Sequence, residues 1–172
     1  ASTGSADITF TGDINLGNGT LDVTGDVVLG VNVTVTATSS GGNGIVLRDA
    51  VNADNASSND RTLTLNSGTG SAIFIGGNVG ASQALAGLTI TQSNGVTFSG
   101  SVNVSDTNSG TITLTDTTNN ANITFSGNVT ADNFVTAAQG YDIFLNGNAT
   151  FANAVTFQNT GTLDLGNQTS DT

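Results

Sequence analysis

Seven residue types are missing from this 172-residue chain: cysteine, proline, methionine, tryptophan, histidine, lysine and glutamate. Without cysteine the chain has neither a disulfide framework nor a thiolate metal site. Without histidine, lysine and glutamate it also lacks most of the acid–base and cationic groups on which polysaccharide lyases and hydrolases depend. We therefore expect a protein that is not an enzyme and holds no cofactor, apart from the calcium considered below.

Positive charge is also scarce, because Arg48 and Arg61 stand against thirteen aspartates and give a formal net charge of −11. Two arginines cannot neutralise a run of phosphates, so we expect no nucleic-acid partner. No stretch approaches 18 consecutive apolar residues, so we expect no membrane insertion. Disorder is not expected either, because the charged fraction is only 9% and 44 residues are Ile, Leu, Val or Phe.

The sequence begins ASTGSAD, with no Met, no basic segment and no apolar segment. This start is typical of a chain from which a signal segment has been removed, or of a piece of something longer. Both interpretations favour an exported protein, and we expect an extracellular or cell-surface location.

Short runs that alternate Thr or Ser with Val, Ile, Leu or Phe dominate the chain, and turns rich in Gly, Asn and Asp separate them. One motif recurs at intervals of 13 to 52 residues, as ITFTGDI (8–14), LDVTGDV (21–27), IFIGGNV (73–79), VTFSGSV (96–102), ITFSGNV (123–129) and IFLNGNA (143–149). A second, tighter series is spaced by about 25 residues or twice that, as LTL (63–65), LTI (88–90), ITL (112–114) and LDL (163–165). A unit of this size buries an apolar face only by stacking on its neighbours.

The sequence therefore predicts an all-β fold, a parallel β-solenoid of roughly seven coils, as a single domain over residues 1–172. An irregular loop at about residues 48–61 interrupts the strand rhythm. We expect ten apolar side chains to point mostly inward: Ile73, Phe74, Leu88, Val96, Phe98, Ile112, Leu114, Ile123, Phe125 and Leu163. The alternative is an antiparallel, pilin-like β-sandwich, in which a segment such as residues 6–14 completes the next subunit by strand donation.

The passage from Ile45 to Val104, with its IVL, RTLTLNSGTGSAIFIGGNVG and GLTITQSNGVTFSGSVNV segments, resembles the repetitive strand-rich regions of large bacterial surface proteins. These are the filamentous-haemagglutinin-like and other β-strand-repeat adhesins. The likeness is one of composition and rhythm, and it covers most of residues 8–165. It implies secretion to the cell exterior, a right-handed β-helical shaft, and a role in adhesion or in a surface filament.

Three groups of side chains are candidates for chemistry. Asp49, Asp54 and Asp60 lie with several asparagines in the irregular loop, and their oxygens predict a calcium site. Four carboxylates could pair across adjacent coils, although Asp is equally typical of turns: Asp106, Asp116, Asp132 and Asp142. Four Thr-x-Thr pairs would stack into a flat array that resembles ice-binding β-solenoids: Thr34/Thr36, Thr62/Thr64, Thr89/Thr91 and Thr111/Thr113.

From these observations we expect an extracellular structural or adhesive protein, a shaft or subunit of a surface filament assembled end to end. Its expected partners are further copies of itself or adjoining repeats of the same polypeptide, together with a host or matrix glycan or protein. An open solenoid end presents unpaired backbone groups and apolar side chains, and it pairs readily with a similar edge. The alternatives are a donor-strand pilus subunit and an ice-binding solenoid.

Overall fold

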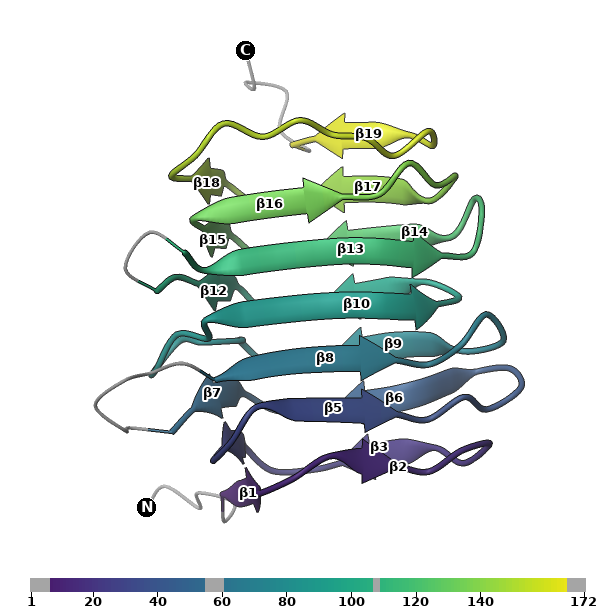
Figure 1. The fold of residues 1–172 in the computed structure, drawn as a ribbon, viewed down its shortest axis with the longest axis vertical. Helices are drawn as coiled ribbons and strands as arrows, with labels where there is room; N and C mark the ends of the chain where they lie inside the picture. Colours follow the sequence, from purple (N-terminus) through teal and green to yellow (C-terminus); the bar gives the residue numbers. More distant parts are fainter. Residues whose placement is uncertain (1–6, 55–60, 107–108, 167–172) are drawn as a thin grey trace.

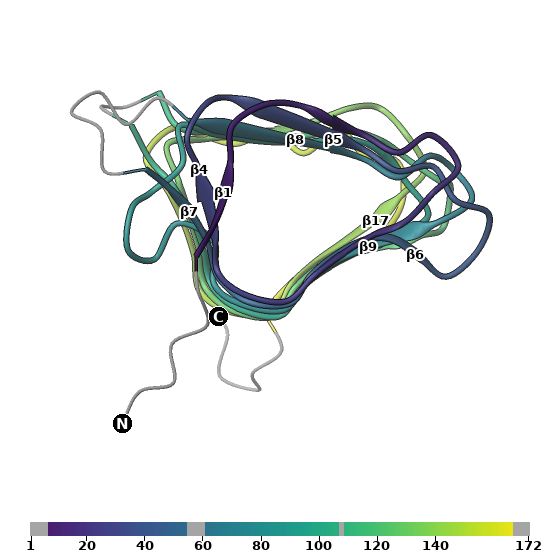
Figure 2. The same cartoon turned by 90° about the horizontal axis from the view of Figure 1, so that it is seen from below.

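The computed structural model describes residues 7–54, 61–106 and 109–166, and there the chain winds into a β-solenoid of about six turns (Figure 1). Each full turn passes through three parallel sheets and contributes a strand to each, except that the fourth turn meets the first sheet only through isolated bridges, and the cross-section seen along the axis is roughly triangular (Figure 2). The predicted parallel solenoid is confirmed. The antiparallel sandwich is wrong, since each pairing between strands of the described chain is parallel.

We number the three sheets in the order in which each turn visits them. Sheet 1 contains β1 (Ile8–Phe10), β4 (Val27–Leu29), β7 (Val51–Ala53), β12 (Val102–Val104), β15 (Val129–Ala131) and β18 (Ala149–Phe151). Single bridges from Val79 to Val51 and to Val102 join its two halves. Sheet 2 contains β2 (Ile14–Asn15), β5 (Val33–Thr36), β8 (Thr62–Asn66), β10 (Gly87–Ser93), β13 (Thr111–Thr117) and β16 (Asn133–Thr136).

Sheet 3 contains β3 (Leu21–Val23), β6 (Asn43–Leu47), β9 (Ala72–Ile75), β11 (Val96–Phe98), β14 (Asn122–Phe125), β17 (Asp142–Leu145) and β19 (Leu163–Leu165). The last pass of the described chain runs through β18 and β19, and residues 152–162 between them form no strand. Sheet 2 therefore stops one rung before the other two sheets.

Side chains alternate between the interior and the surface as predicted, because every second residue of a strand faces the interior. Eight of the ten residues predicted to point inward are buried, with exposed fractions of 2% or less. The prediction is wrong for Phe74, which faces outward because its neighbours Ile73 and Ile75 take the inward positions of β9. Leu163 is 37% exposed, because it belongs to the last strand of the stack.

The expected loop at residues 48–61 is shorter in the structure. Residues 51–53 form β7, and Val51 and Ala53 are buried in the core. The short apolar segment Ala50–Val51 among Asp and Asn residues concealed this strand. Residues 55–60 lie outside the described chain.

The corner between sheets 3 and 1 depends on a column of glycines, which we call the glycine corner: Gly77, Gly100, Gly127 and Gly147. A Cβ atom on Gly127 would lie 2.6 Å from the carbonyl carbon of Gly100 and 2.6 Å from the amide nitrogen of Ser101. An asparagine that follows one of these glycines also stabilises the corner, by a hydrogen bond to the next rung. The side-chain oxygen of Asn78 accepts a hydrogen bond from the Ser101 amide (2.9 Å), and that of Asn128 accepts one from the Asn148 amide (3.1 Å).

One buried phenol closes the corner between sheets 2 and 3 near the last rungs. The Tyr141 hydroxyl donates a hydrogen bond to the Leu114 carbonyl (2.9 Å) and accepts one from the Ala137 amide (2.9 Å). The side chain is fully buried. Phenylalanine rings fill the core on the two rungs before that of Tyr141, with Phe98 and Phe125 stacked at a centroid distance of 4.7 Å.

We predict that Gly127→Ala lowers the free energy of unfolding by about 1–3 kcal/mol, because the new methyl group overlaps the backbone of the preceding rung. The matched control is Gly12→Ala, where a Cβ atom meets nothing within 4 Å. Denaturant unfolding of both variants checks this. Equal stability of the two variants would contradict the close packing of the glycine corner.

We predict that Tyr141→Phe costs about 0.5–1.5 kcal/mol, because it removes the hydrogen bonds of the hydroxyl while the Ala137 amide and the Leu114 carbonyl keep the bond to each other (3.0 Å). Burial also raises the pKa of Tyr141, since the phenolate loses its hydration. The native state therefore disfavours the ionised form, and wild-type stability should fall as the pH rises above about 10, whereas the phenylalanine variant should lack that loss.

Tyr141 is the single tyrosine of the chain, so phenolate absorbance reports its titration directly. The unfolding free energy of both proteins measured between neutral and alkaline pH supplies the comparison. If the unfolding free energies of the two proteins fell equally with rising pH, the loss of stability at alkaline pH would not come from the Tyr141 phenol.

Candidate functional site

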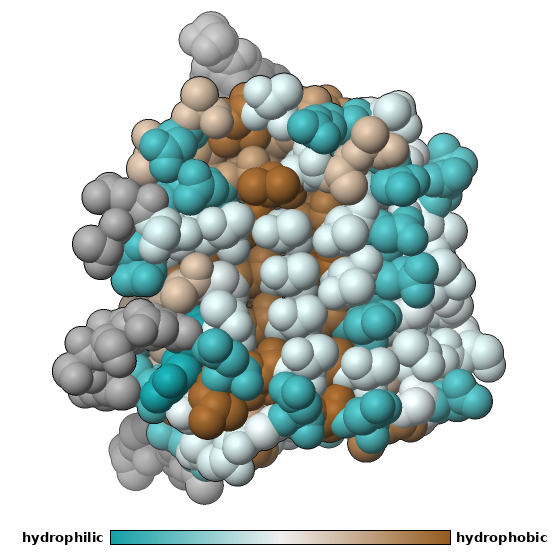
Figure 3. Space-filling model, viewed as in Figure 1, coloured by the Kyte–Doolittle hydropathy of each residue, from teal (hydrophilic) through white to brown (hydrophobic). Residues whose placement is uncertain are grey.

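The outward side of sheet 2 carries an in-register column of threonines, Thr34, Thr64, Thr89 and Thr113, which we call the threonine column. Each strand contributes one member, and the residues on either side point into the core. Figure 3 shows this face with pale, near-neutral side chains in regular rows over β8, β10 and β13. In the part of the chain that the structure describes, the four hydroxyls make no hydrogen bond to protein groups and are free to face water.

The four Thr-x-Thr pairs do not stack pair upon pair, as the sequence analysis expected, because the register is offset between strands. In β5 and β10 the first threonine of the pair enters the threonine column, whereas in β8 and β13 the second one does. Three of the four remaining threonines lie in two flanking columns, and Thr91 lies at the bulge between Ile90 and Gln92. On one side Thr62, Gly87 and Thr111 follow one another, and on the other side Thr36 lies beside Asn66.

The carboxylates predicted to bind calcium are engaged elsewhere. An Asp49 carboxylate oxygen accepts a hydrogen bond from the Gly25 amide at 2.7 Å, and Asp54 forms a bidentate ion pair with Arg61 at 2.9 Å. Asp60, the third candidate, lies outside the described residues. Within the described ranges, no group of three or more acidic side chains is placed to hold a metal ion. The calcium site stays a prediction.

Three of the four carboxylates considered for catalysis accept hydrogen bonds from amides, two of them at corners. One Asp132 oxygen accepts hydrogen bonds from the amides of Asp106 (3.0 Å) and Gly110 (2.8 Å). An Asp142 oxygen accepts one from the Thr162 amide, and Asp116 accepts one from the Gln92 side-chain amide (3.2 Å). The contacts of Asp132 and Asp142 match the turn role predicted for aspartate, whereas Asp116 lies within β13 and bonds across sheet 2 to β10.

One exposed ion pair links the first two rungs of sheet 3. The Arg48 guanidinium donates two hydrogen bonds to the Asp22 carboxylate, at 2.7 and 2.6 Å. These bonds lower the pKa of Asp22 and raise that of Arg48. Both side chains are about half exposed, so the ion pair contributes little to stability. The pair lies at the end of the stack, because Asp22 belongs to β3, the first strand of sheet 3.

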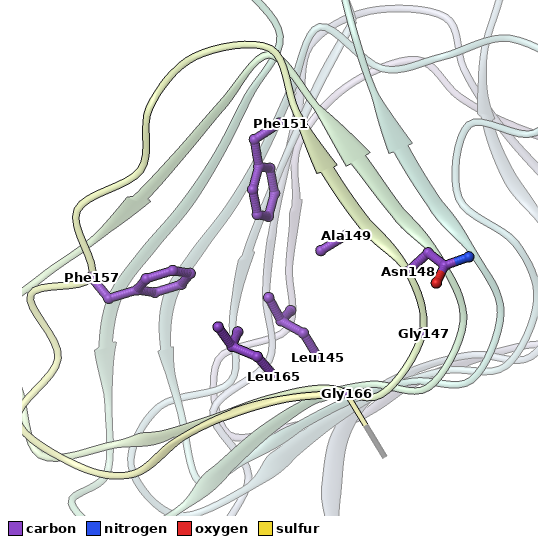
Figure 4. A pocket seen from close by; sticks show the side chains of 8 residues that line it. All are labelled: Leu145, Gly147, Asn148, Ala149, Phe151, Phe157, Leu165 and Gly166. Carbon is purple, nitrogen blue, oxygen red and sulfur yellow. The ribbon is translucent and has the colours of Figure 1, made fainter. Parts of the chain in front are cut away.

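An apolar hollow opens at the end of the stack formed by β18 and β19. Five of its side chains are apolar, and Figure 4 shows them converging on the solenoid interior: Leu145, Ala149, Phe151, Phe157 and Leu165. Phe134 links the hollow to the core, because its ring lies 5.1 Å from that of Phe151 and 5.7 Å from that of Phe157. Leu165 is 56% exposed.

The sequence predicts open apolar ends but does not identify the residues of this hollow. Phe151 and Phe157 stand in a segment where the strand rhythm fades, FANAVTFQN (151–159). The signal that could have identified Phe151 is the alternation of inward and outward residues along β18. Its in-register neighbour in β15 places Ala149 and Phe151 on the inward side.

No protein-family model, curated protein or solved structure matches this chain. The described residues contain no helix that could cross a membrane.

Proposed function

We propose that this chain is a structural segment of an extracellular filament, a shaft whose coils continue from one unit to the next and which carries an adhesive role. The observation that supports this proposal most is the apolar hollow at the end of the stack, beside strands that have a neighbour on one side only among the described strands. A solitary solenoid gains from covering such an end, and a filament covers it at every junction.

Other features agree with a structural role. Most of the buried side chains are aliphatic or aromatic, and two of the aspartates considered for catalysis, Asp132 and Asp142, accept hydrogen bonds at corners. The likeness in composition and rhythm to β-strand-repeat adhesins supports an exported shaft. Host or matrix glycans and proteins are the adhesive partners that we propose, and calcium is a proposed ligand through Asp49, Asp54 and Asp60.

Immunogold labelling of intact cells of the source organism tests this proposal. We predict that antibodies against the whole chain label filaments outside the cell, with no need for permeabilisation. Labelling that appears only after permeabilisation would contradict an extracellular shaft. A glycan array and broad polysaccharide assays on the same protein examine adhesion, and specific turnover of any polysaccharide would refute the non-enzymatic assignment.

The threonine column favours a second candidate function, the binding of ice. An ice surface is an uncharged, regular lattice of water, and a rigid array of hydroxyl and methyl groups can order water in the same way. The rungs repeat at about 4.8 Å, and outward residues along a strand repeat at about 6.6 Å. The threonine column itself carries no charged side chain from β5 to β13, while Gln92 and Asp116 lie further along β10 and β13 (Figure 3).

We predict that a Thr64→Tyr/Thr89→Tyr variant loses most of any inhibition of ice recrystallisation, because two rings break the flat array. The matched control is Thr97→Tyr/Thr124→Tyr, which places the same change on two paired outward positions of sheet 3. Tyrosine is favoured on exposed strands, so neither variant should unfold. Equal loss in both variants, or no activity in the wild type, would sink the ice-binding candidate.

A further inference from the structure

We propose that the end of the stack bearing β18 and β19 is a docking surface for the opposite end of a second copy, in one defined register. In this register Thr150 of β18 lies opposite Thr9 of the second copy's β1. Asp164 of β19 lies opposite Asp22 of its β3. The inference deepens the proposed filament function, on which it rests, by naming the partner and the contact.

The strands at the two ends are available for such pairing. Among the described strands, β18 pairs with β15 and β19 with β17, while at the other end β1 pairs with β4 and β3 with β6. One outer edge of each of these end strands therefore has no described strand beside it. Such an edge is a template for another strand of the same direction.

The order of the sheets makes the two ends complementary. Each turn visits sheet 1, then sheet 2, then sheet 3, so the strand that follows β19 in a continuous solenoid belongs to sheet 1 and lies on β18. In a second copy that strand is β1. Its β2 then covers residues 152–162, where sheet 2 lacks its last strand, and its β3 lies on β19.

The inward and outward positions also agree across the junction. In β18, Ala149 and Phe151 occupy the inward positions of their rung, and in β1, Ile8 and Phe10 do. A shift by one residue would turn every apolar side chain of one end toward solvent.

The same agreement holds in sheet 3. Leu163 and Leu165 of β19 share inward positions with Ile143 and Leu145, and they meet Leu21 and Val23 of β3. The exposed apolar side chains of both ends are thereby covered. Leu165 is 56% exposed, Leu163 37% and Ile8 36% in the single chain. The apolar hollow of Figure 4 becomes an interior layer of the core.

These features favour a second copy over an unrelated partner. A peptide strand added to one sheet would cover one edge, whereas another solenoid of the same pitch covers the edges of sheets 1 and 3 together and the apolar hollow between them. The junction is a head-to-tail contact, which generates an open fibre and no closed ring.

The charged side chains at the junction determine how docking depends on salt. Asp164 and Asp22 are directly opposite in the proposed register, and like charges in that position repel. The Arg48 guanidinium, one rung further along the second copy, already binds Asp22 and offsets part of this repulsion. We therefore expect docking to strengthen with salt, and Asp164→Asn to tighten it by up to about fivefold.

Disulfide trapping tests the register, because the chain has no cysteine of its own. We predict that the full chain carrying Thr9→Cys and Thr150→Cys forms a ladder of covalent oligomers under mild oxidation. Opposed residues on neighbouring strands lie about 4.8 Å apart, within the Cα range of a disulfide. Within one chain the two positions lie six rungs apart, about 29 Å, so an internal disulfide cannot form.

The register control pairs Thr150→Cys with Thr11→Cys, two residues further along the chain, where the expected Cα separation of about 8 Å is too long for a disulfide. A further variant, Leu165→Asp, should lower oligomer formation by the Thr9/Thr150 cysteines at least tenfold, whereas Val135→Asp should not. Val135 is similarly exposed, at 47%, but lies on the side of sheet 2. Equal ladders from the two cysteine pairs would overturn the register.

Absence of covalent oligomers at every protein, salt and calcium concentration would overturn end-to-end docking itself. The proposed function fails by a different result, the loss of surface labelling on intact cells, so the two failures are distinguishable. Surface labelling without oligomers would leave a shaft whose neighbouring coils belong to the same polypeptide.

Discussion

Backbone hydrogen bonding between successive coils is the interaction on which the rest of this structure depends. Every strand pairs in parallel with the strand one turn earlier or later, so each turn must return to the same three faces in register. A chain without proline keeps all its amides available for this pairing. The corners must then be tight, and the glycine corner meets that requirement with contacts too close for any Cβ atom.

The same constraint fixes the chemistry of the corners and faces. Where a turn leaves an amide of a neighbouring rung without a strand partner, an Asn or Asp oxygen accepts its hydrogen bond, as Asn78, Asn128 and Asp132 do. Asparagine and aspartate are therefore abundant for a structural reason. Outward strand positions need only suit an extended backbone, and threonine does so at low cost. Regular faces such as the threonine column follow from the pairing without any separate selection for flatness.

The sequence carried enough information to predict the class of fold, because both the alternation of side chains and the repeat near 25 residues are properties of the backbone arrangement. It was less informative where an element is short or its period is broken. Two apolar neighbours at Ile73–Phe74 conceal which one points inward, and the acidic surroundings of Val51 conceal β7. Register across strands was beyond sequence reasoning, because the spacing of the repeats does not reveal that Thr34 and Thr89, each first in its pair, lie beside Thr64, the second in its pair. The roles of Asp49 and Asp54 depend on contacts with residues of another rung or across the loop, which composition does not reveal.

A solenoid differs from a globular domain in that its core has no natural boundary along the axis. The sides of the solenoid need no partner, since their outward residues face water on every rung. Each end, in contrast, exposes inward side chains and strand edges that would be covered in an interior layer. The exposure of Leu165 beside the fully buried Leu114 and Phe125 illustrates this: the same alternation that buries a residue in the middle exposes it at the end. The hydrophobic contribution of a rung is complete only when a further rung lies on it, at about 25 cal/mol for each Å² of apolar surface covered. Parallel strand pairing places each coil on the one before it. The same pairing therefore determines which partner fits the end of the stack: another coil of the same pitch and direction.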